Sequence, residues 1–186
     1  MSDSQKPDTF SRIVNGIAGV LDAILGVVIV TGFSVMVACV VWQVFSRYVL
    51  QTPSIYTDEI SRFLFIWLAL IGGAYTFGKG RHLAIELLSP ALSGWRKKLS
   101  ELLVLVIIAF FAIMVMMKGG GGLVARTLAN GQVSPAMQLP MGYIYLAIPI
   151  GGAIILFYCI QMALKVINRD DDVEIGQSEA AGGPLD

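Results

Sequence analysis

The chain has 186 residues, of which 56% are hydrophobic and 14% charged, whereas soluble domains have about 25% charged residues. Small folds leave much of their surface exposed, so this excess of apolar side chains predicts a surface that faces lipid. Thirteen basic and thirteen acidic residues give a net charge of zero, which argues against nucleic-acid binding. One histidine and two cysteines are too few for a dinuclear metal centre, a pair of haem ligands or a disulfide framework.

Four long uncharged stretches predict an all-α integral membrane protein with four transmembrane helices. About 20 helical residues cross a hydrocarbon core about 30 Å thick. On this basis the expected spans are about residues 20–46, 58–78, 99–118 and 140–166. The first is longer than the apolar part of a signal peptide and is expected to remain as an anchor. In the fourth, Pro149 and the glycines that follow it predict a kink near mid-membrane.

The segments between and after the spans differ in character. His82 to Ser100 has apolar residues at helical spacing, interrupted at Pro90, which predicts a short interfacial helical segment between spans two and three. Gly119 to Gly122 is expected to form a flexible joint that leads to an outer loop ending near Leu139. Residues 1–168 thus form a four-helix membrane domain, and the acidic tail 169–186 has a composition typical of disorder.

The distribution of basic residues predicts the orientation of the chain. Nine Lys and Arg lie on the side of the termini and of the loop between spans two and three. Four lie on the opposite side, namely Arg47, Arg62, Lys118 and Arg126. Because cytoplasmic segments contain the excess of positive charge, we expect both termini in the cytoplasm.

The uncharged stretches are residues 23–46, 63–78, 102–117 and 127–164, and the absence of Asp, Glu, Lys, Arg and His from them is the main functional clue. Ionisable groups within a bilayer normally mark ion paths, proton relays and ligand counter-ions. Matching helix breaks, which are typical of transporter binding sites, are also missing, because only the fourth span has a central Pro-Gly break. We therefore expect no catalytic, metal-binding or substrate-binding residues here, and a partner protein that supplies any transport chemistry.

A charged cluster lies at the outer ends of the first two spans. Arg47 closes the first span, and Asp58, Glu59 and Arg62 open the second, with Thr57 as a candidate N-cap. One interpretation is an ordinary solvated helix start with an ion pair between Asp58 and Arg62, four residues apart. The other is that the cluster docks a second membrane protein by buried charge pairing. The sequence leaves both interpretations open.

The remaining reactive side chains have structural explanations. His82 has too few neighbouring ligands for a metal site and is expected to tie the loop to a helix end. Cys39 and Cys159 differ in depth by about 15 to 20 Å at 1.5 Å per residue, which is too far for a disulfide. Ala69 and Gly73, four residues apart, favour close approach of another helix, by default within the bundle.

Several short motifs occur in order between Trp42 and Leu88: Arg47-Tyr48, Asp58-Glu59 with Arg62, Phe65 with Trp67, Gly73-Ala74, and Gly80 with His82. The segment from Ser134 to Gly152 adds Pro135, Pro140, Tyr145 and Pro149. In this order and spacing the chain resembles the small permease subunit (DctQ/SiaQ-like) of tripartite ATP-independent periplasmic (TRAP) transporters. It departs from the family pattern at Tyr56, where Trp is frequent, and near Met141 and Gly142, where aromatic residues are frequent.

The resemblance implies one part of a three-part importer in the bacterial inner membrane. A soluble binding protein captures an organic acid in the periplasm, a large multi-span subunit moves it with sodium, and the small subunit binds the large one. Sodium is then expected in the large subunit, and no cofactor in this chain. The expected subunit-interface residues are Arg47, Asp58, Glu59, Arg62, Trp67, Gly73, His82 and Pro149. Lys118 and Arg126 are candidates for docking the binding protein.

Two other functional classes compete with this interpretation. A self-assembling small channel or exporter would need polar residues along a shared pore, and only Thr31, Ser34, Gln43 and Gln161 are available. A membrane enzyme is disfavoured because the chain lacks a Gly-x-Ser-x-Gly elbow, paired histidines and acidic residues within the uncharged stretches.

Overall fold

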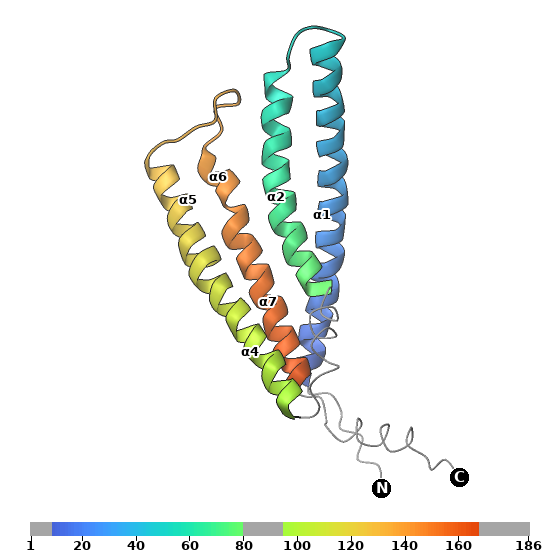
Figure 1. The fold of residues 1–186 in the computed structure, drawn as a ribbon, viewed down its shortest axis with the longest axis vertical. Helices are drawn as coiled ribbons and strands as arrows, with labels where there is room; N and C mark the ends of the chain where they lie inside the picture. Colours follow the sequence, from blue (N-terminus) through green and yellow to red (C-terminus); the bar gives the residue numbers. More distant parts are fainter. Residues whose placement is uncertain (1–8, 80–94, 168–186) are drawn as a thin grey trace, which may run out of the picture.

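The computed structural model describes residues 9–79 and 95–167, and their regular structure is helical (Figure 1). Within these ranges, four helices are long and apolar enough to cross a membrane, which confirms the predicted all-α membrane fold. These spans are Val14–Tyr48, Ile55–Lys79, Lys98–Ala129 and Met141–Ile167. His82, most of the predicted interfacial segment and the acidic tail lie outside the described residues.

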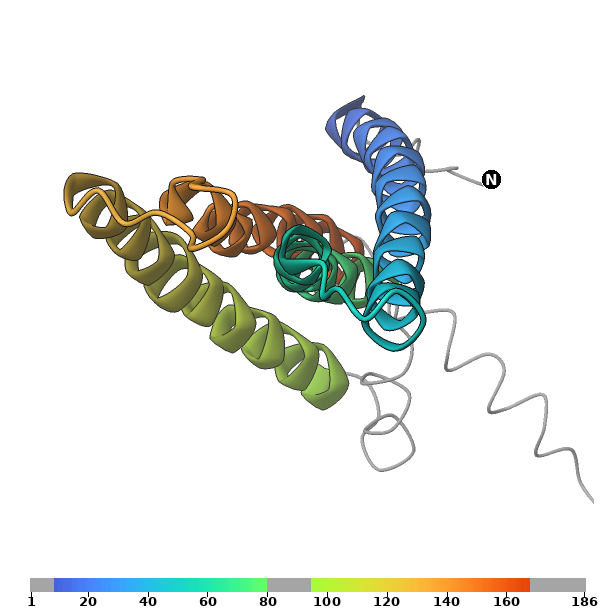
Figure 2. The same ribbon diagram turned by 90° about the horizontal axis from the view of Figure 1, so that it is seen from above.

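The helices follow one another in alternating directions. The first two spans belong to α1 (Thr9–Tyr48) and α2 (Ile55–Lys79). The third consists of α4 (Trp95–Phe111), a π-helical segment η2 (Ala112–Gly119) and α5 (Gly120–Ala129). The fourth consists of the short α6 (Met141–Tyr145) and α7 (Ala147–Ile167). Seen from above, α1 and α4–α5 lie on opposite sides of the central pair α2 and α7 (Figure 2).

This arrangement buries the fourth span best and the first span least. The buried share of the most apolar window is 39% for Met141–Ile167 but 6% for Val14–Tyr48. A cluster of Leu25, Ile71 and Tyr158 joins α1, α2 and α7, and a second cluster joins α4 to α7. Most of the apolar surface of α1 and of α4–α5 is therefore open to lipid or to a partner.

The third span is longer than predicted, because the glycine run is helical. Gly119 and Gly120 have right-handed helical backbone angles, and the helix ends only at Ala129. A Cβ atom on Gly120 would lie 2.7 Å from Ile148 Cγ2 and 3.2 Å from Pro149 Cδ, so this glycine permits close packing on α7. Within a bilayer, backbone amides must also bond inside the segment. The expectation of a flexible joint and of a loop starting at Gly119 is wrong.

The fourth span is interrupted nearer its outer end than predicted. Regular helix stops at Tyr145 and resumes at Ala147, so the irregular residue is Leu146. Pro149 has no N–H to donate to the Tyr145 carbonyl four residues earlier, so one helical hydrogen bond is missing next to Leu146. Helical bonds continue on either side, since the Leu146 and Ile150 amides donate to the carbonyls of Gly142 and Leu146.

Candidate subunit interface and outer surface

The charged cluster at the outer end of α2 forms the predicted local ion pair. Arg62 Nη2 donates to Asp58 Oδ2 at 2.9 Å, and these side chains are 69% and 45% exposed. The Gln43 amide donates to the other Asp58 oxygen and so links α1 to α2. Thr57 lies inside the helix, and its hydroxyl donates to the Ser54 carbonyl at 3.2 Å. The prediction of Thr57 as the N-cap is therefore wrong.

Glu59 is buried and bonded within the chain. Its Oε2 accepts hydrogen bonds from the backbone amides of Ala136 at 3.2 Å and Met137 at 2.7 Å. These amides belong to the loop between α5 and α6, 77 and 78 residues away in sequence. A carboxylate that accepts two backbone amides makes strong, charge-assisted bonds. Glu59 thus holds the outer loop against the start of α2, a contact that its sequence neighbours do not reveal.

The same outer loop has its own internal bonds. Ser134 is fully buried; its amide donates to the Leu139 carbonyl at 2.9 Å, and its Oγ accepts the Leu139 amide at 3.2 Å. Gln138 adopts a positive φ of 56° at the tip, and the Met141 amide donates to the Gln132 carbonyl at 2.9 Å. The loop is consequently a compact turn with a defined shape.

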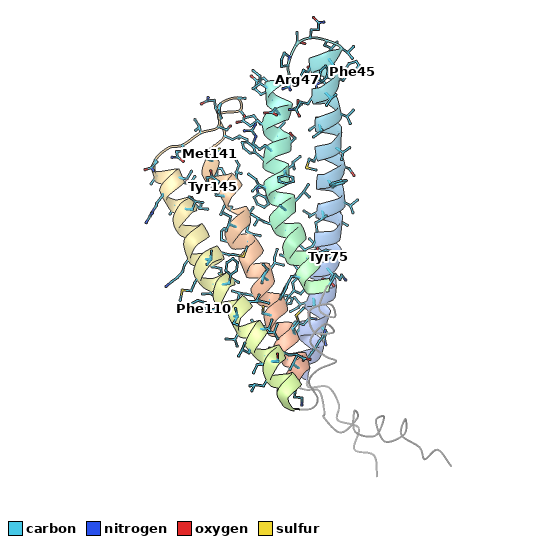
Figure 3. The ribbon with its side chains drawn as sticks, in the orientation of Figure 1. Phe45, Arg47, Tyr75, Phe110, Met141 and Tyr145 are labelled. Atoms are coloured by element: carbon cyan, nitrogen blue, oxygen red, sulfur yellow. The ribbon has the colours of Figure 1, made fainter. Side chains whose placement is uncertain are left out.

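The other predicted interface residues divide into inward and outward positions. Trp67 packs against the cluster of Leu25, Ile71 and Tyr158, and Pro149 lies next to the Cβ position of Gly120. Gly73 and Arg47 are exposed, and no atom lies within 4 Å of the Cβ position of Gly73. Figure 3 shows Arg47 at the outer end of α1, beside the connection to α2. Gly73 and Arg47 are thus more open to a partner than Trp67 and Pro149, which are half-buried.

A second polar cluster, which we call the inner junction, lies at the opposite end of the bundle. Asp22 of α1 accepts bonds from the Tyr158 hydroxyl at 2.5 Å and from Lys79 Nζ at 2.7 Å. Tyr158 is 1% exposed, and Gly78 makes room for its ring, because a Cβ there would lie 2.6 Å from it. The junction connects α1, α2 and α7.

Sequence reasoning missed the inner junction. Asp22 directly precedes an uncharged stretch and was taken only as the limit of that stretch. Tyr158 in an otherwise apolar helix was the available signal, because a buried tyrosine hydroxyl normally has a hydrogen-bond partner. A further bond nearby, from Gln161 Nε2 to Asn15 Oδ1 at 3.0 Å, also connects α7 to α1.

The two candidate docking cations occupy different depths. Arg126 is exposed one turn before the outer end of α5. Lys118 is also exposed, but it lies inside the continuous helix, eleven residues before that end. The third helix therefore continues well beyond Lys118, which the sequence analysis treated as the limit of the span.

The described residues include few groups that could bind a metal or react. In residues 9–79 and 95–167 no three His, Cys, Asp or Glu side chains lie close enough together to hold a metal ion. Cys39 and Cys159 are free thiols, as their depths predict.

Comparison with known proteins identifies the family. The family described as tripartite ATP-independent periplasmic transporters, DctQ component, matches residues 36–169, well over half of the chain. The chain belongs to this family. The match includes the outer cluster, the third span with Lys118, and the loop bonded to Glu59. As a TRAP small permease with four apolar helices, it is a multi-pass membrane protein.

Several small permease proteins of TRAP transporters are similar to this chain. That of a C4-dicarboxylate transporter from Rhodobacter capsulatus is 31% identical over 117 residues, which are 59% of this chain and 48% of the relative. The small permease of an ectoine transporter from Halomonas elongata is 26% identical over 161 residues, which are 84% of this chain and 82% of the relative. The small permease of a sialic acid transporter from Vibrio cholerae is 27% identical over 81 residues, which are 44% of this chain and 43% of the relative. The first match spans about half of its relative's length.

Proposed function

We propose that this TRAP small permease is the scaffold subunit of a sodium-driven, binding-protein-dependent importer of organic acids. It binds the large permease subunit in the inner membrane, and sodium binds to that large subunit. The observation that carries the proposal is the open bundle, in which only 6% of the most apolar window of α1 is buried. A surface this apolar and this little covered is suited to a larger membrane partner.

The polar residues of the spans support a scaffold over a channel. Gln43 and Gln161 each bond within the chain, and the Ser34 hydroxyl donates to the Val30 carbonyl at 2.8 Å. Three of the four side chains available to line a shared pore are thus engaged in internal contacts. A self-assembled channel would need these groups to face water.

The substrate class rests on the relatives. Two of them are named for a C4-dicarboxylate and for sialic acid, and a third is named for ectoine. We therefore propose an organic acid as a class and name no individual compound. Arg126, near the outer loop, is the proposed contact for the binding protein, which charge reversal and the salt dependence of uptake would test.

Purification of the tagged chain together with its co-expressed large subunit tests the assembly. We expect the large subunit to be recovered in detergent with the small chain. Recovery of only further copies of the small chain would favour the channel alternative and contradict the scaffold.

Cysteine labelling tests the proposed orientation. Lys118 lies in a span, so three of the four outer cations remain near the outer surface, and the asymmetry of charge becomes larger. In a variant without Cys39 and Cys159, an impermeant reagent added outside the cell should modify a cysteine at Asn130 and spare one at Ile167. The opposite pattern would place the termini outside.

A further inference from the structure

Contacts between three helices fix the depth of Lys118. A Cβ atom on Gly151 of α7 would lie 3.5 Å from Met116 Cε in η2 and 3.5 Å from the carbonyl oxygen of Leu70 in α2. Met116, Gly151 and Leu70 therefore lie at one level of the bundle. Lys118 follows Met116 by two residues, about 3 Å further toward the outer side at 1.5 Å per residue.

Leu70 lies near the middle of the membrane. Arg62 and Lys79 are the charged residues that limit the apolar part of α2, and Leu70 is eight residues from the first and nine from the second. These separations are about 12 to 14 Å at 1.5 Å per residue, close to half of a hydrocarbon core about 30 Å thick. The Lys118 backbone consequently lies close to mid-membrane.

The Lys118 side chain points out of the bundle and has no ionic or hydrogen-bonding partner among residues 9–79 and 95–167. Its four-carbon stem is too short to cover the remaining distance of about 10 Å to the outer charged level, so snorkelling does not bring the ammonium group into water. Charged groups at this depth are costly and almost always pair with another polar group. Residues 9–79 and 95–167 leave this requirement unmet.

The surface around Lys118 is apolar and permits close approach. Met114, four residues and about one turn of the π-helix before it, is 44% exposed. One turn after it, Gly121 and Gly122 have no atom within 4 Å of their Cβ positions. Small residues allow another helix to approach closely within a membrane. Lys118 itself lies in η2, which is π-helical, a rare conformation that occurs often at functional sites. Phe110, labelled in Figure 3, projects outward from the same helix.

We propose that Lys118 forms an intramembrane ion pair with an Asp or Glu carboxylate in a span of the large permease subunit. The helix of that subunit packs along the face formed by Met114, Lys118, Gly121 and Gly122. This proposal rests on the proposed scaffold function. It identifies the positive charge of Lys118 as the feature that selects the large subunit. In this proposal Lys118 contacts the large subunit and no longer serves as a docking residue for the soluble binding protein.

Three variants and one cross-link test the ion pair in the co-expressed complex. Lys118→Met removes the charge and should lower recovery of the large subunit at least about tenfold, because an unpaired carboxylate remains in the interface. Lys118→Arg keeps the charge and should retain recovery. Met114→Leu, on the same face without a change of charge, is the matched control and should also retain it. A benzophenone amino acid at position 118 should cross-link to the large subunit.

The outcomes separate this contact from the scaffold function. Unchanged recovery with Lys118→Met, or cross-links only to lipid or to a second copy of the chain, would overturn the ion pair while leaving the scaffold intact. Failure of the unchanged chain to recover the large subunit would overturn both. A loss in the Met114→Leu control equal to that in Lys118→Met would show that packing, and not charge, determines the contact.

Discussion

Replacement of Glu59 by alanine is expected to free the outer loop while the four spans stay assembled. The substitution removes the oxygen that accepts the Ala136 and Met137 amides in two part-buried hydrogen bonds, and a hydrogen bond to a charged group contributes about 1.5 to 3 kcal/mol. Because opening of the loop is a local event, we expect amide exchange at these two positions to accelerate by about 30-fold or more, which corresponds to about 2 kcal/mol.

Glu59→Gln is the matched variant, since it keeps an oxygen acceptor and loses only the charge. Its effect on exchange should be smaller than that of Glu59→Ala. The same pair distinguishes the internal role of Glu59 from the interface role expected from sequence. Loss of the large subunit with Glu59→Ala while the exchange of Ala136 stays unchanged would show that Glu59 pairs with the partner and does not hold the loop.

Replacement of Asp22 by alanine should destabilise the helix bundle more than breaking the Asp58–Arg62 ion pair of the outer cluster. The Tyr158 hydroxyl is buried and would lose its acceptor, which costs about 1 to 3 kcal/mol. The bond to Lys79, whose side chain is 53% exposed, adds at most about 1 kcal/mol. We expect a total loss of about 1 to 4 kcal/mol, measured as a lower midpoint of thermal unfolding in detergent.

Two comparisons make the Asp22 result specific. Asp22→Asn keeps an acceptor for Tyr158 and should cost less than Asp22→Ala. Arg62→Ala breaks an ion pair whose side chains are 69% and 45% exposed, so it should cost at most about 1 kcal/mol. Equal midpoints for Asp22→Ala and the unchanged chain would contradict a structural role for the junction.

The sequence was sufficient to predict the number of spans, because a helix that crosses a bilayer must be long and apolar. The ends of the second and fourth spans, Ile55–Lys79 and Met141–Ile167, lie close to the predicted positions, since charges or a proline mark them. The third span was misjudged because Lys118 was treated as a boundary. Hydropathy does not distinguish a cation at the rim from one that a partner neutralises within the membrane.

The polar contacts were harder to predict because they join distant parts of the chain. The pairing of Asp58 with Arg62 follows from helical spacing alone. The hydrogen bonds that Ala136 and Met137 donate to Glu59 depend on how α2 packs against the outer loop. No local sequence pattern predicts this packing. A glycine's role likewise depends on its neighbours: Gly120 packs on α7, whereas Gly73 faces open space.

Uptake by reconstituted vesicles tests the central claim, that this chain supports transport without conducting substrate itself. Vesicles should contain the small chain alone, the large subunit alone, or both, with the binding protein and an inward sodium gradient. The account predicts uptake of an organic acid only when both subunits are present and the binding protein is added. Uptake by vesicles that contain the small chain alone would contradict it.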